Sequence, residues 1–159
     1  MIDPLTVVAG SSIILNKASL PWETSNGNVS EGPVVIDSGE NYYVIYSATS
    51  TWSDDYSLGM LQINKTRDPM QISSWYKHPN PVFVKNVEEG VFGPGHASFT
   101  VSPDGSEHWM VYHAMNRTVG PRSMPHLLQS TLSFESNWLN DFRSTPKATT
   151  EQQEFRRLQ

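Results

Sequence analysis

The sequence repeats itself with a period of about 65 residues, and this duplication constrains the fold more than any other feature. In the first unit Glu31-Gly-Pro-Val-Val-Ile-Asp precedes Asn41-Tyr-Tyr-Val-Ile-Tyr-Ser-Ala. In the second unit His96-Ala-Ser-Phe-Thr-Val-Ser precedes Glu107-His-Trp-Met-Val-Tyr-His-Ala. Glu31 and His96 are 65 residues apart, and Tyr46 and Tyr112 are 66 apart. A repeat of this length is typical of propellers and other repeat architectures, in which one supersecondary unit is used several times.

Each unit contains four short runs with the composition of β-strands. The chain has 5 Trp, 6 Tyr and 6 Phe, which favour strands, and Asp37-Ser-Gly-Glu and Pro103-Asp-Gly-Ser supply turn residues. We predict strands at Val34–Asp37, Tyr42–Ala48, Ser57–Ile63 and Val82–Lys85 in the first unit, and at Ala97–Val101, His108–Ala114, Leu127–Phe134 and Thr145–Ala148 in the second. The run Tyr42–Ala48 is apolar enough to be buried on both faces. Four-stranded sheets that repeat at this length are typical of the blades of a β-propeller.

The predicted fold class is therefore all-β, a β-propeller fragment of about two four-stranded blades plus the last strand of a preceding blade. Ile13–Lys17 is similar to Val82–Lys85 and is the expected last strand of that preceding blade. Residues 1–159 then form one partial propeller domain. Its expected parts are the end of the preceding blade with a linker (1–30), a first blade (31–92), a second blade (93–148) and a polar tail (149–159). Because blades bury their faces against neighbours, we also expect self-association through exposed flanks.

Charge and hydropathy exclude several classes of partner. The formal net charge is −5 and the isoelectric point is about 5.4, so no basic surface is available to bind nucleic acid. No apolar run is long enough to cross a membrane. The N-terminus has neither the basic region nor the apolar run of a signal peptide, so we expect no signal peptide in this chain. There is no Cys for thiol chemistry or disulfides.

Two motif sets in the repeat are similar to those of glycoside hydrolase family 43. One set runs from Ser30-Glu31-Gly32-Pro33 through Tyr42–Ala48 to Trp52-Ser-Asp-Asp-Tyr-Ser-Leu-Gly-Met-Leu. The other runs from Val91-Phe-Gly-Pro-Gly-His-Ala-Ser-Phe through Ser102-Pro-Asp-Gly to Trp109-Met-Val-Tyr-His-Ala. The resemblance extends from about Ile13 to Ala148, and the ordered set is far more specific than Glu-Gly-Pro alone.

The resemblance implies a five-bladed propeller from an extracellular, inverting glycosidase that acts on arabinose- or xylose-containing polysaccharides. In that family the Glu of the Glu-Gly-Pro motif is the general acid, which implies this role for Glu31. The His of Gly-Pro-Gly-His lies near the central channel and often helps to hold a metal ion, commonly calcium, which implies substrate and metal contacts for His96. The aspartate base and a second aspartate belong to earlier blades, and no matching segment is present here. Arg122 is the candidate for a sugar-binding arginine, although the run from Gly120 to Gln129 departs from the family pattern.

Elementary chemistry leaves alternatives for each of these residues. An inverting glycosidase needs two carboxyl groups about 6.5–9.5 Å apart, and the acid must hold a proton at working pH. Glu31 could instead be an ordinary exposed loop residue. His96 could be a structural, hydrogen-bonded His, because calcium prefers oxygen ligands. Trp52 could stack on a sugar ring or pack on its own hairpin.

Two functions follow from these residues. The first is hydrolysis of O-glycosyl bonds by an α-L-arabinofuranosidase or β-xylosidase, with this chain carrying the acid and inactive alone. The second is a non-catalytic role, as a truncated relic or a carbohydrate-binding module. Neither the sugar, the linkage nor exo versus endo action follows from the sequence.

Overall fold

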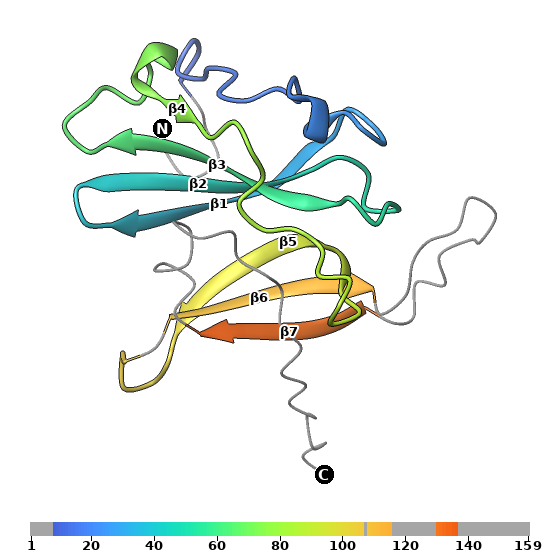
Figure 1. Ribbon diagram of the computed structural model, residues 1–159. Coiled ribbons are helices and arrows are strands. Elements are labelled where there is room, and N and C mark those ends of the chain that lie inside the picture. Colours follow the sequence, from blue (N-terminus) through green and yellow to red (C-terminus); the bar gives the residue numbers. More distant parts are fainter. Residues whose placement is uncertain (1–7, 107, 116–129, 137–159) are drawn as a thin grey trace.

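Two antiparallel sheets make up the computed structural model, which describes residues 8–106, 108–115 and 130–136 (Figure 1). The first sheet has the strand order β1 (Ser30–Ser38), β2 (Asn41–Ala48), β3 (Ser57–Asn64) and β4 (Tyr76–Lys77). The second has the order β5 (Phe92–Val101), β6 (His108–Met115) and β7 (Ser130–Ser136). Helix in the described ranges is confined to two 3₁₀ turns, η1 (Pro21–Glu23) and η2 (Ile72–Ser74). The prediction of an all-β propeller fragment is confirmed.

The strands form at runs of apolar and β-branched residues, and turn residues separate one run from the next. The hairpin between β1 and β2 turns at Gly39, whose φ of +55° lies in the left-handed region that glycine adopts without strain. The predicted strand Leu127–Phe134 corresponds to β7 from Ser130 on, whereas residues 127–129 and the predicted strand Thr145–Ala148 lie outside the described residues. In the part of the chain that the structure describes, no helix is long and apolar enough to cross a membrane.

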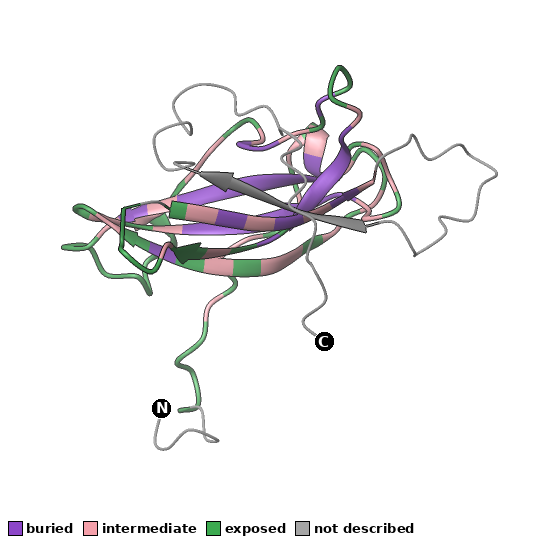
Figure 2. Ribbon diagram, turned by 90° about the horizontal axis from the view of Figure 1, so that it is seen from below, coloured by how far each residue is buried: buried purple, intermediate pink, exposed green. Residues whose placement is uncertain are grey.

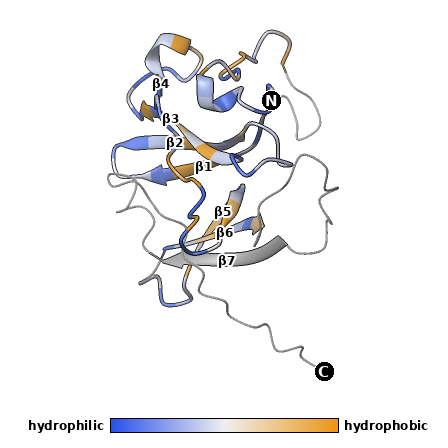
Figure 3. Cartoon of the chain, turned by 45° about the vertical axis from the view of Figure 1, so that its right-hand side comes forward, coloured by the Kyte–Doolittle hydropathy of each residue, from blue (hydrophilic) through white to orange (hydrophobic). Residues whose placement is uncertain are grey.

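The predicted fourth strand of the first unit, Val82–Lys85, is wrong. The fourth strand is β4, which pairs with β3, whereas Phe83 forms only an isolated bridge with Leu58. Val82 and Phe83 are 3% and 2% exposed, because their side chains join the apolar cluster between the two sheets where the connection from β4 to β5 runs from the first sheet to the second (Figure 3). An apolar run indicates burial, and a buried connection and a buried strand have the same composition.

The expected strand at Ile13–Lys17 is also absent, because this segment has no regular structure. A β-strand requires a hydrogen-bonded neighbouring strand, and the described hydrogen bonds of this segment are single bonds to side chains. The Nζ atom of Lys77 donates to the carbonyl oxygen of Lys17 at 3.0 Å, and Asn16 donates to the Oγ atom of Ser30 at 2.8 Å. Leu15 packs against the outer face of the first sheet. The segment therefore covers that face without adding a strand to it.

Apolar side chains fill both faces of the first sheet. Between the two sheets lies a cluster that includes Ile45, Leu58, Phe83, Met110 and Tyr112. On the outer face a second cluster lies under Leu15, Trp22 and Trp75; its members are Val44, Tyr46, Ala48 and Leu61. Strand β2 is consequently buried on both faces over its last five residues, as its sequence predicts (Figure 2).

Both units contain a β-bulge near the start of the first strand, and the strand register around it corrects the alignment of the repeat. The register pairs Glu31 with Ser47 and Gly95 with His113, each followed by a shift of one residue. Glu31 therefore corresponds to Gly95, one residue before the His96 that the sequence repeat indicates. Gly32 and His96 are the matching pair, with φ values of +55° and +51°. The first strands of the two units are thus 64 residues apart and the second strands 66 apart, a difference that the hydrogen-bond ladder shows and the weak sequence repeat does not.

Some large apolar side chains remain exposed on the described surface. Val35 is 64% exposed, Tyr76 is 54% exposed and Val101 is 51% exposed. Self-association through such flanks stays a prediction.

Candidate functional site

Glu31 lies in β1 at the bulge, where the strand departs from regular pairing. Its backbone partner across the sheet is Ser47 of β2, and the pairing resumes with a shift at Val34. Gly32 adopts the left-handed φ of +55° at the bulge without strain, whereas its counterpart in the second unit, His96, has a side chain and a φ of +51°. The side chain of Glu31 is half-buried. The Glu-Gly-Pro motif therefore places a carboxyl group at a bend in the strand.

The hydroxyl of Tyr56 donates a hydrogen bond to the carboxyl group of Glu31. The distance from the Tyr56 oxygen to Oε1 of Glu31 is 2.9 Å. Tyr56 directly precedes β3 and is fully buried. Burial raises the pKa of Tyr56 well above its usual 10, a hydrogen bond with Ser47 lowers it, and the neighbouring Glu31 raises it further. The phenol therefore keeps its proton at working pH and remains a donor.

Two histidines of the second sheet extend this contact. The ring of His113 in β6 stacks on Tyr56, with centroids 5.5 Å apart and 10° between the planes. The ring of His96 in β5 stacks in turn on His113, at 6.2 Å and 26°. Burial lowers the pKa of His113, repulsion from His96 lowers it further, and Glu31 opposes both effects. His113 is thus a neutral imidazole at neutral pH.

The two sheets approach each other closely at this point and are joined by a hydrogen bond. The amide of His96 donates to the Oγ atom of Ser47 at 2.8 Å. A Cβ atom added at Gly32 would lie 3.2 Å from the His96 ring. At Gly95 an added Cβ would lie 2.3 Å from the Tyr56 ring, closer than van der Waals contact allows. Each glycine is therefore a point where one sheet approaches the other. Glu31, Ser47, Tyr56, His96 and His113 together are named the Glu31 cluster.

The side chains of the Glu31 cluster do not by themselves supply the ligands of a calcium site. Among residues 8–106, 108–115 and 130–136, no three His, Cys, Asp or Glu side chains gather as metal ligands would. Calcium takes six to eight oxygen ligands, whereas His96 and His113 offer nitrogen. A contact of His96 with calcium through water stays a prediction.

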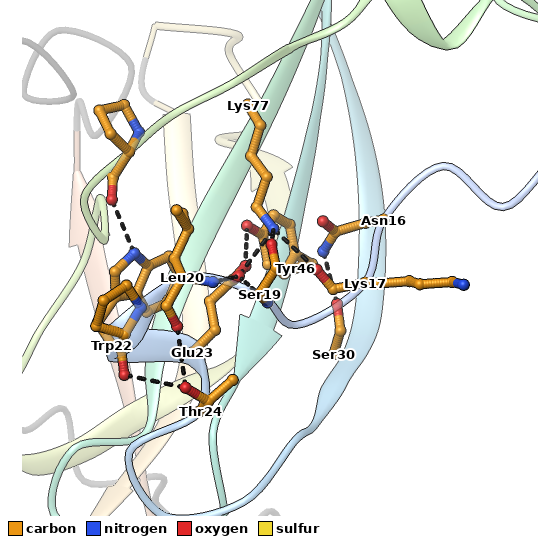
Figure 4. A network of polar contacts seen from close by, with 12 residues as sticks. Asn16, Lys17, Ser19, Leu20, Trp22, Glu23, Thr24, Ser30, Tyr46 and Lys77 are labelled. Atoms are coloured by element: carbon orange, nitrogen blue, oxygen red, sulfur yellow. Dashed lines mark hydrogen bonds and ion pairs between the residues drawn. The ribbon is translucent and has the colours of Figure 1, made fainter.

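Glu23 carries a buried carboxylate, and Figure 4 shows the donors that surround it. It is 0% exposed. Its Oε2 atom accepts hydrogen bonds from the Nζ atom of Lys77 and the amides of Ser19 and Leu20, each at 2.8 Å. Its Oε1 atom accepts one from the Tyr46 hydroxyl at 2.7 Å. With four donors on two oxygens, Glu23 ties the N-terminal segment to the sheet and has a structural role.

The remaining predicted site residues are not joined to the cluster by a described contact. Trp52 lies in the loop between β2 and β3, which ends at Tyr56, and its side chain is 50% exposed. It therefore does not pack fully on its own hairpin. Arg122 lies outside the described residues.

Sequence reasoning missed three members of the cluster, Ser47, Tyr56 and His113. The repeat held a signal for Ser47 and His113, because they follow the matched residues Tyr46 and Tyr112 and lie at equivalent positions opposite the two bulges. Tyr56 is 25 residues from Glu31, and no local pattern joins the two.

A family model and individual relatives match this chain. The model of glycosyl hydrolases family 43 covers residues 1–141. The extracellular exo-α-(1→5)-L-arabinofuranosidase of Streptomyces avermitilis is 40% identical over 116 residues, 73% of this chain and 24% of the relative. The α-L-arabinofuranosidase B of Pyricularia oryzae is 39% identical over 114 residues, 72% of this chain and 23% of the relative.

Solved structures agree with these sequence relatives. A crystal structure of an α-L-arabinofuranosidase from Lactobacillus brevis superposes with a TM-score of 0.70 and 34% identity, covering 77% of this chain and 37% of that chain. A thermostable family-43 glycoside hydrolase superposes with a TM-score of 0.59 and 36% identity, covering 74% and 36%. The chain thus spans about a quarter of the length of these curated relatives and over a third of these solved ones.

Proposed function

Since this chain belongs to glycosyl hydrolases family 43, we propose that it contributes the general acid, Glu31, to an enzyme that hydrolyses O-glycosyl bonds in arabinose-containing polysaccharides. The substrate class follows from the relatives, which are named arabinofuranosidases. A β-xylosidase activity is the alternative within the same class of chemistry. The extracellular name of the Streptomyces avermitilis relative supports an extracellular parent protein.

The observation that carries this proposal is the environment of Glu31. Its carboxyl group is half-buried at a strand bulge and has one oxygen bonded to a buried phenol. Glu23 shows the contrast, since both of its oxygens are engaged by donors, a positive charge among them. A general acid must present a carboxyl oxygen to the substrate, and a carboxylate with four donors on two oxygens is poorly suited to that.

The proposed reaction is a single displacement with inversion. Glu31 protonates the leaving glycosidic oxygen while a second carboxylate, about 6.5–9.5 Å away, activates the attacking water. We assign this second carboxylate to the part of the family fold that the chain does not span. The chain covers 24% of the Streptomyces avermitilis relative, which leaves room for both aspartates that the family uses.

Reconstitution tests the proposal. We expect the chain alone to release no p-nitrophenol from p-nitrophenyl α-L-arabinofuranoside or β-D-xyloside. The same chain mixed with the complementary propeller part of the Streptomyces avermitilis relative should become active, because the acid and base then share one site. Turnover by the monomeric chain alone would contradict the assignment of the base to another part of the fold. Folded components that never become active together would favour a non-catalytic role.

A non-catalytic role in sugar binding is the second candidate, and the half-exposed ring of Trp52 favours it. An exposed aromatic face supplies a large apolar surface for a sugar ring. If binding is the function, titration calorimetry with arabino-oligosaccharides should show affinity that survives Glu31→Gln. Trp52→Ala should weaken that affinity by about tenfold, as expected for the loss of one aromatic contact. Absence of binding by the correctly folded chain would exclude this candidate.

A further inference from the structure

The geometry points to Tyr56 as the residue that positions the proposed acid Glu31, with the second sheet holding Tyr56 in place. This inference rests on the proposed function of Glu31. It assigns a separate role to a residue that does not itself touch the reacting bond.

The first observation is the direction of the hydrogen bond. The Tyr56 hydroxyl donates to Oε1 of Glu31 at 2.9 Å. A phenol can donate to the carbonyl oxygen of a neutral carboxylic acid and equally to a carboxylate. The contact therefore persists before and after proton transfer. With Oε1 engaged by Tyr56, Oε2 is the oxygen that would carry the proton to the leaving group.

The second observation is the burial of Tyr56. Its side chain is 0% exposed, so the ring cannot change rotamer without disturbing the core. Burial, with the neighbouring Glu31, raises the pKa of Tyr56 beyond its usual range, even though Ser47 opposes the shift. The hydroxyl is thus a donor fixed in place across the pH range of any glycosidase.

The third observation is that two paired residues of the second sheet, Gly95 and His113, contact the Tyr56 ring. His113 stacks on the ring at 5.5 Å, and Gly95 approaches it so closely that a Cβ atom there would lie 2.3 Å away. The amide of His96, the next residue, bonds to Ser47 at 2.8 Å. The position of the first sheet's carboxyl group therefore depends on backbone positions in β5 and β6.

The fourth observation is a matched contact elsewhere in the same sheet. The Tyr46 hydroxyl donates to Glu23 at 2.7 Å, and Tyr46 is 2% exposed. This is also a buried phenol bonded to a carboxylate, but it belongs to the structural network around Lys77. Tyr46→Phe is consequently a control that removes the same type of bond without touching the Glu31 cluster.

Two measurements test the inference. In the reconstituted enzyme, Tyr56→Phe should lower kcat by about tenfold to a hundredfold with KM nearly unchanged, because misplacing a catalytic group by about 1 Å has that effect. Tyr46→Phe should lower the melting temperature and leave kcat unchanged. On the chain alone, ¹³C NMR should show that Tyr56→Phe displaces the side-chain carboxyl resonance of Glu31, which Glu31→Gln identifies by removing it. Tyr46→Phe should leave that resonance in place.

The outcomes separate this inference from the function on which it rests. A lowered kcat for Glu31→Gln together with an unchanged kcat for Tyr56→Phe would overturn the positioning role and leave the acid intact. An unchanged kcat for Glu31→Gln would overturn the acid. The NMR measurement decides whether Tyr56 fixes Glu31 in two situations: when Glu31→Gln leaves kcat unchanged, and when no reconstituted activity is obtained. An unmoved carboxyl resonance in Tyr56→Phe overturns the inference in every case.

Discussion

Glu31→Gln is expected to lower kcat of the reconstituted enzyme on arabino-oligosaccharides by about 10²–10⁴-fold, the usual contribution of general acid catalysis. Glutamine keeps the shape of the side chain and can still accept the hydrogen bond from Tyr56, but it has no proton to give to the leaving oxygen. The loss should be much smaller on 2,4-dinitrophenyl α-L-arabinofuranoside, because dinitrophenolate departs without being protonated. Steady-state kinetics on both substrates measure the difference.

The matched control for this prediction is Glu40→Gln. Glu40 is exposed in the turn between β1 and β2, beyond the opposite end of β1 from Glu31. Its kinetics should equal those of the unmodified chain on both substrates. Equal losses for Glu31→Gln on the oligosaccharide and on the activated glycoside would show that Glu31 does not protonate the leaving group.

Glu23→Ala is expected to lower the free energy of unfolding by about 3–5 kcal/mol, the typical result of removing one partner from a buried ion pair. The substitution leaves the Tyr46 hydroxyl, the Lys77 ammonium group and two backbone amides without their acceptor. Urea denaturation followed by Trp fluorescence measures the loss. Because the chain could fail to fold with so large a loss, Glu23→Gln serves as a milder variant that keeps the side-chain volume.

The same carboxylate makes stability depend on pH. Burial by itself raises the pKa of Glu23, but hydrogen bonds from Lys77, from the amides of Ser19 and Leu20, and from Tyr46 together hold the pKa below the usual 4.5. The unfolded state therefore takes up a proton at higher pH than the folded state does. The stability from the ionised carboxylate is full above about pH 4.5 and is lost as pH falls through the folded value.

Denaturation curves across this acidic range test the sign of the effect. Glu23→Gln should be less stable at neutral pH and should lose less stability on acidification than the unmodified chain. Glu40→Gln, with its exposed side chain, should follow the unmodified chain at every pH. A Glu23→Gln curve parallel to that of the unmodified chain would assign the pH dependence to other carboxyl groups.

Local composition was enough to predict most of the strands. The apolar run at Tyr42–Ala48 became β2, buried on both faces over its last five residues, and the turn at Gly39 formed where the sequence predicted it. Composition failed for Val82–Lys85 and Ile13–Lys17, because an apolar run has the same pattern whether or not a neighbouring strand pairs with it. Strand identity depends on that partner, which lies elsewhere in the chain.

The candidate site was predictable only in part. Glu31 was found from the Glu-Gly-Pro motif, and the structure explains the glycine through a left-handed φ at the bulge. Tyr56 and His113 were not found, since Tyr56 bonds to Glu31 from 25 residues away and His113 joins them from the second sheet by stacking on Tyr56. The repeat was also misaligned, because the first strands of the two units are 64 residues apart and the second strands 66, so that Gly95 and not His96 corresponds to Glu31 in the register.

The sequence by itself determined the all-β class, the family and the carboxyl group at the first bulge, because these depend on residue types and their order. Only the tertiary structure decided that Glu23 and Glu31 differ. Four donors surround Glu23, whereas the phenol of Tyr56 engages one oxygen of Glu31. The physical reason is that a hydrogen bond requires two atoms within about 3 Å in the right direction. That distance is set by how the segments of the fold pack on one another, which the type and order of residues do not specify.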